Sequence, residues 1–154
     1  MSKLSICAAV ALALPLGVVC QTTQNNSFAG IWKLNIAKSK FNPGPAPKSE
    51  TVTIPAGTGK VEVHEVNADG KDIRWSYPVP LAPGATVPVD GVDGATVSAK
   101  NTGDHVVDQT WKFPDFTGTG HGVLSNDGKV MRYTLTGTNP EGKPVHNVLI
   151  YEKQ

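Results

Sequence analysis

Apolar and polar residues alternate along most of this chain, and this period of two constrains the fold more than any other feature. The alternation is clearest over residues 73–79, 107–113 and 131–136. Strands with one apolar and one polar face are typical of an antiparallel sheet around a single core. No segment after residue 21 shows a 3.6-residue apolar period over a dozen positions. The sequence therefore predicts an all-β fold.

Turn residues separate the alternating stretches. Asn or Asp stands beside Gly in residues 67–71, 101–104, 126–129 and 139–143, as in tight turns between strands. The pattern predicts ten strands, near residues 28–35, 49–55, 60–67, 72–79, 86–89, 95–100, 105–113, 118–125, 129–137 and 145–152. Pro88 predicts an edge position for its strand. The glycines of 118–122 predict a bulged or bent strand.

Ten short strands in one open sheet would leave unpaired edges, and closure into a barrel removes them. The sequence accordingly predicts a single domain over residues 28–154, folded as a small antiparallel up-and-down barrel. A two-sheet β-sandwich is the alternative. Residues 38–48 and 78–94 are rich in Pro and Gly, and we interpret them as loops.

The first twenty residues have the pattern of a secretory signal peptide. Lys3 supplies a basic start, residues 4–19 are almost wholly apolar, and the run is shorter than a membrane-spanning helix requires. Residues 21–27 are polar and suit a flexible N-terminus. The prediction is cleavage after Cys20 and export, with no transmembrane segment in the mature chain. The alternative is a lipoprotein anchored through Cys20.

Residues 28–35 read Phe-Ala-Gly-Ile-Trp-Lys-Leu-Asn, and the Gly30-x-Trp32 motif on a first strand resembles the lipocalin-type (calycin) barrels. The resemblance implies that Trp32 packs across one end of the barrel and that Gly30 permits a close backbone approach. The wider pattern, with residues 38–48 and 144–153, is similar to a group of small exported bacterial proteins that carries no assigned function. Lipocalin-type proteins usually bind small apolar molecules.

Aromatic residues supply the candidate binding site. The residues Trp75, Tyr77, Trp111 and Tyr133 fall in the same phase of three predicted strands. They would line a cavity for an apolar ligand if the barrel is hollow, or form an ordinary core if it is filled. The four histidines lack metal-ligand spacing, and no nucleophile–base pair can be assembled. We therefore predict no catalytic residue, no metal and no cofactor.

Charge excludes one class of partner. The chain has 14 Lys and Arg against 13 Asp and Glu, so no strong field attracts nucleic acid.

Two functions follow as hypotheses. The first is an exported small-molecule binding protein that holds an apolar ligand in its barrel. The second is a non-catalytic structural or interaction protein of the periplasm or cell surface with a filled barrel. The sequence makes no prediction of oligomeric state.

Overall fold

Ten antiparallel strands form one continuous sheet in the computed structural model, which describes residues 26–154. The strands are β1 (Gly30–Leu34), β2 (Ser49–Ile54), β3 (Gly59–Val66), β4 (Asp72–Val79), β5 (Thr86–Pro88), β6 (Thr96–Gly103), β7 (Val106–Phe113), β8 (Phe116–Leu124), β9 (Val130–Thr138) and β10 (Pro144–Lys153). All ten predicted strands are present, with ends displaced by a few residues. The predicted leader, residues 1–20, lies outside the described residues.

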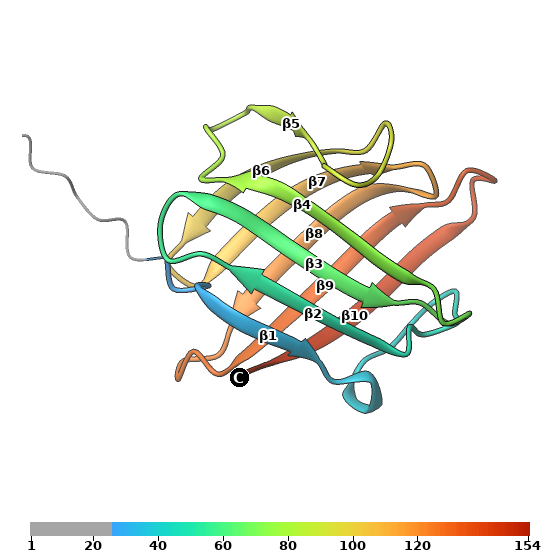
Figure 1. The fold of residues 1–154 in the computed structure, drawn as a ribbon, viewed down its shortest axis with the longest axis horizontal. Coiled ribbons are helices and arrows are strands. Elements are labelled where there is room, and N and C mark those ends of the chain that lie inside the picture. Colours follow the sequence, from blue (N-terminus) through green and yellow to red (C-terminus); the bar gives the residue numbers. More distant parts are fainter. Residues whose placement is uncertain (1–25) are drawn as a thin grey trace, which may run out of the picture.

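The sheet curls until its two edges meet. The strand order is β4-β3-β2-β1-β10-β9-β8-β7-β6-β5, so β1 pairs with both β2 and β10. Figure 1 shows β1–β4 crossing in front of β6–β10. The edges join where Ser76 N donates to Asp90 O at 3.0 Å and Asp90 N donates to Ser76 O at 2.8 Å. This bridge nearly closes the barrel, and the barrel prediction is confirmed over the sandwich.

Proline occupies both edge strands. Pro88 ends β5, as the sequence predicts, and Pro78 lies in β4 at the opposite edge of the sheet. Proline has no N–H to donate, so an edge is where a strand tolerates it best.

Glycine in β8 does not interrupt the strand. Residues 117–124 pair in an unbroken register with β9, and the whole of 116–123 pairs with β7. The sequence predicts a bulge or a bend at 118–122, and the bulge is therefore wrong. The glycines instead make room on the inner face, because Gly120 lies opposite the inward-facing Gln109 and Leu135.

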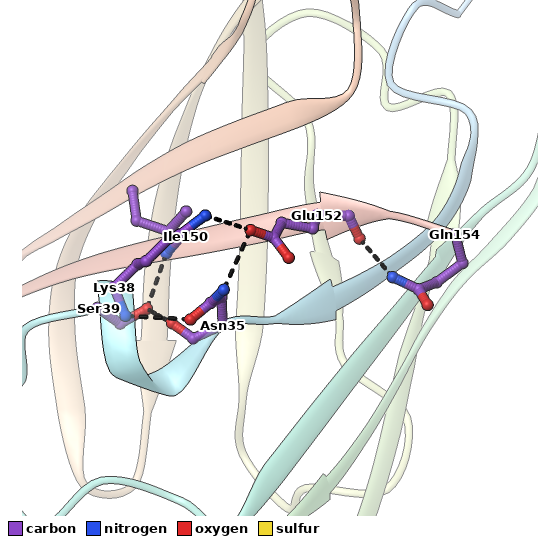
Figure 2. A network of polar contacts seen from close by, with 6 residues as sticks. All are labelled: Asn35, Lys38, Ser39, Ile150, Glu152 and Gln154. Atoms are coloured by element: carbon purple, nitrogen blue, oxygen red, sulfur yellow. Dashed lines mark hydrogen bonds and ion pairs between the residues drawn. The ribbon is translucent and has the colours of Figure 1, made fainter.

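The segment after β1 runs beside β10 and is held to it by hydrogen bonds (Figure 2). A single 3-10 turn, η1 (Ile36–Lys38), follows β1. Ser39 Oγ accepts from Ile150 N at 2.9 Å, while Asn35 and Lys38 both donate to Glu152 Oε1, at 3.0 and 2.8 Å. Within the described residues, no helix has the length and apolarity that a membrane crossing requires.

The buried side chains form two clusters on the inner face. One lies mainly on β3, β4, β6 and β7 and contains Val61, Val63, Tyr77, Val89, Ala95, Val97 and Trp111. The other lies on β1 and β8–β10 and contains Trp32, Leu34, Leu124, Met131, Leu149 and Tyr151. Val52, Ile54 and Leu135 are partly buried and pack against both clusters.

Candidate functional site

A cavity of about 2610 Å³ occupies the barrel. It reaches both ends, since its lining includes Gly57 in the β2–β3 turn and Asn139 in the β9–β10 turn. Small-molecule pockets typically measure roughly 300–1,000 Å³. A small ligand would therefore occupy only part of the space, and the placement of specific side chains decides which part.

The four predicted site residues Trp75, Tyr77, Trp111 and Tyr133 all line this cavity. The strand alternation brings three of them together, and Phe113 joins them. The ring centroid of Trp75 lies 5.7 Å from that of Trp111 and 5.4 Å from that of Phe113, and both ring pairs meet edge to face. Tyr77 meets Trp111 at 5.5 Å. We call Trp75, Tyr77, Trp111 and Phe113 the aromatic cluster.

Tyr133 belongs to the site through hydrogen bonds rather than ring stacking. Trp111 Nε1 donates to Tyr133 Oη at 2.7 Å, and Tyr133 Oη donates to Gln109 Oε1 at 2.6 Å. Gln109 Nε2 then donates to Tyr77 Oη at 3.0 Å. Burial raises the pKa of Tyr77 to about 12 and raises that of Tyr133 further. Both hydroxyls are therefore neutral at physiological pH.

An acidic group inside the barrel is the feature that the sequence analysis missed. Glu50 on β2 accepts a hydrogen bond from the Tyr151 hydroxyl on β10. Burial, opposed by that bond and aided by the charge of Glu65, raises the pKa of Glu50 from 4.5 to about 7. Burial followed by the charge of Asp115 also raises the pKa of Glu65. The sequence did contain a signal for Glu50. Residues 50, 52 and 54 lie on the same face of β2, and Val52 and Ile54 point inward.

Trp32 and Gly30, the residues of the Gly-x-Trp motif, lie on β1. The Trp32 side chain is fully buried, and its Nε1 donates to Phe28 O at 2.8 Å. Lys153 Nζ lies 5.2 Å from the centroid of the Trp32 ring. Gly30 has φ +137°, and a Cβ there would lie 2.5 Å from Lys153 Cε, so the lysine stem passes close against the glycine.

Two histidine–aspartate pairs lie on the outer face of the barrel. His64 Nε2 is 2.6 Å from Asp72 Oδ2, and His121 Nδ1 is 2.6 Å from Asp108 Oδ1. These pairs are substantially exposed. Among residues 26–154, no three His, Cys, Asp or Glu side chains are grouped as metal ligands would be. The inner face, with its aromatic rings and half-buried carboxyls, is therefore where binding chemistry is concentrated.

Comparison with known proteins addresses the fold. No family model and no curated protein sequence matches the chain. Among solved structures, it is similar to the crystal structure of a variant of the fluorescent protein UnaG. The TM-score is 0.51 at 19% identity, over 83% of this chain and 96% of that chain. The chain has a calycin-type barrel fold. At this identity the likeness establishes the fold alone, so any function must be argued from the cavity.

Proposed function

We propose that this protein is an exported binding protein that holds a small, largely apolar molecule in its barrel. The cavity lined by the aromatic cluster carries the proposal. An apolar body that leaves water for this space gains about 25 cal/mol per Å² of buried apolar surface and meets several ring faces and edges. The hypothesis of a filled structural barrel lacks this support, because it requires that the same space be occupied by side chains.

The test uses N-phenyl-1-naphthylamine, a neutral dye whose emission rises in apolar surroundings. We expect saturable fluorescence enhancement with the wild-type protein. A rise in melting temperature with dye concentration should accompany it, because a ligand that binds only the folded state stabilises that state. The absence of both effects would favour the structural hypothesis.

Two variants test whether the ligand binds inside the barrel. Trp75→Leu removes a half-buried ring that contacts three other rings. We expect it to weaken dye binding several-fold, since an aromatic contact contributes roughly 0.5–1.5 kcal/mol beyond its area. The control is Ile31→Ala, which trims an apolar side chain that is 48% exposed. Equal losses in the two variants would place the dye outside the barrel.

A further inference from the structure

The lining of the cavity is acidic. Four carboxyl residues border it, Glu50, Glu65, Asp104 and Asp115. Of the described lining residues, the one cation is Lys100. Lys100 stands on β6 opposite Asp108, in the phase that points away from the inward-facing Val97 and Ala99. The ion pairs among the described residues include neither Glu50 nor Glu65. Glu50 and Glu65, the two half-buried carboxyls of the lining, therefore have no ion-pair partner among the described residues.

Glu50 has unused bonding capacity. Its Oε1 accepts from the Tyr151 hydroxyl, and its other oxygen has no donor among residues 26–154. No described side-chain oxygen or nitrogen is sealed in the protein without a partner, so this second oxygen is accessible to solvent, and Glu50 lines the cavity. A carboxylate removed from water is costly unless it is paired. A ligand that displaces water from Glu50 must therefore offer a hydrogen-bond donor, and a cationic donor compensates the charge best.

The aromatic cluster lines the same cavity as this carboxyl and complements the same chemistry. Tyr133 accepts a hydrogen bond from Trp111 and lines the same cavity as Glu50. Faces of Trp and Tyr rings attract cations within about 6 Å by roughly 0.5–2 kcal/mol. A fatty acid would instead bring a carboxylate into an interior whose nearest charges are carboxyls.

We propose that the ligand is an apolar organic cation, with a protonated amine at Glu50 and a ring or chain against the aromatic cluster. This inference rests on the proposed binding function and specifies the chemical class of its ligand. A neutral apolar molecule binds less tightly to the same cavity, and a carboxylate of the same size binds least tightly.

The experiment compares three probes that share a ring and differ in charge: 1-naphthylmethylamine, 1-naphthylmethanol and 1-naphthoate. Isothermal titration calorimetry at pH 8 and low salt gives each Kd with the wild-type protein. We expect the amine to bind at least tenfold more tightly than the alcohol, and the carboxylate to bind most weakly. Equal affinities for the amine and the alcohol, or a preference for the carboxylate, would overturn the inference while leaving the binding function intact.

The variant Glu50→Gln tests whether this one residue causes the preference for the amine. The amide keeps an acceptor for the Tyr151 hydroxyl and removes the charge. We expect it to weaken amine binding about tenfold, which is the Kd change that 1.4 kcal/mol produces, and to leave alcohol binding within twofold. Glu62→Gln, on the exposed outer face of β3, is the matched control and should change neither Kd. An unchanged amine Kd in Glu50→Gln would remove Glu50 from the site.

Wild-type protein alone decides the outcome if Glu50→Gln does not fold, since the ranking of the three probes requires no variant. Failure of all three probes to bind would overturn the inference. The neutral dye titration judges the binding function separately, so the two failures are distinguishable.

Discussion

Two of the glycines in β8, Gly120 and Gly122, determine where the Tyr133 ring lies. Gly118, Gly120 and Gly122 take successive inward positions, and a Cβ on Gly120 would overlap the Tyr133 hydroxyl and come within 2.8 Å of its ring. A Cβ on Gly122 would stand 3.1 Å from the same ring. The tyrosine therefore lies flat against bare backbone, which brings its hydroxyl between Trp111 and Gln109.

Gly120→Ala should destabilise the protein and disrupt this arrangement. Overpacking a fitted interior typically costs 1–3 kcal/mol, and Tyr133 must move for the methyl to fit. A denaturant midpoint measures the loss, and the indole N–H resonance of Trp111 should shift as its acceptor moves. Gly103→Ala is the control because a Cβ there meets nothing within 4 Å. Equal midpoints for the two variants would show that Tyr133 does not depend on the glycine.

Glu50 should make folding stability depend on pH near neutrality. Its pKa is 4.5 in ordinary surroundings and about 7 in the fold, so between these values the folded state binds more protons than the unfolded state. Stability is therefore greatest at acidic pH and falls as pH rises through about 7. The groups facing Glu50 are Tyr151 from β10, Tyr133 from β9 and Glu65 from β3. Neither tyrosine ionises in this range.

Denaturant unfolding between pH 5 and pH 8 measures this effect. At about 1.4 kcal/mol per pKa unit, the wild type should lose on the order of 3 kcal/mol across the range. Glu50→Gln should show a much flatter profile, with a residual slope from Glu65, whose pKa is raised in the same direction. Glu62→Gln should keep the wild-type slope. Parallel profiles for the wild type and Glu50→Gln would contradict the buried position of this carboxyl.

At the scale of elements, the weakest part of the barrel is the junction between β4 and the segment after β5. Two hydrogen bonds between Ser76 and Asp90 hold it, whereas β9 and β10 pair along nine residues of each strand. Gly91 follows at once with φ +90°, and a Cβ there would overlap Arg74 O and stand 3.3 Å from Trp75 Cα. The edges can approach only because this position is glycine.

Gly91→Ala should therefore open the junction. The alanine faces both an unfavourable positive φ and a clash with β4, so we expect a loss of several kcal/mol. Gly94→Ala shares the positive φ, at +73°, and meets nothing within 4 Å, so it measures the cost of φ alone. Hydrogen exchange at the Ser76 and Asp90 amides should accelerate in the first variant. Similar exchange rates in the two variants would show that β4 adjusts to the methyl group.

Local signals explain why the strands were predictable and the acidic site was not. Apolar–polar alternation and Asn-Gly or Asp-Gly turns can be recognised within a few neighbouring residues. The same is true of the prolines in β4 and β5, which are the two edge strands. The Glu50–Tyr151 contact joins residues 101 positions apart, and only the closed register of β2, β1 and β10 brings them together. The Gly-rich run in β8 was misinterpreted because Gly120 and Gly122 make room for Tyr133 on β9, a contact that the local sequence does not show.

For the molecule as a whole, the proposed function requires that export precede binding. The proposed cleavage after Cys20 falls ahead of the first described contact, in which Asn26 Nδ2 donates to Pro55 O at 3.2 Å. Every described strand and both clusters therefore belong to the part of the chain that would remain. Removal of the leader would also remove both cysteines, Cys7 and Cys20, so the folded barrel would contain no thiol.

The exported protein should accordingly begin at Gln21 and carry no lipid. Expression with the full leader, followed by intact mass measurement of the exported fraction, should give the mass of residues 21–154. The purified mature form should also keep its dye affinity under reducing conditions, because no disulfide would hold the barrel. A mass that includes Cys20 with a diacylglyceryl group would instead show a lipoprotein. The barrel would then be anchored at a membrane surface by its N-terminal end, and its ligand would be captured there.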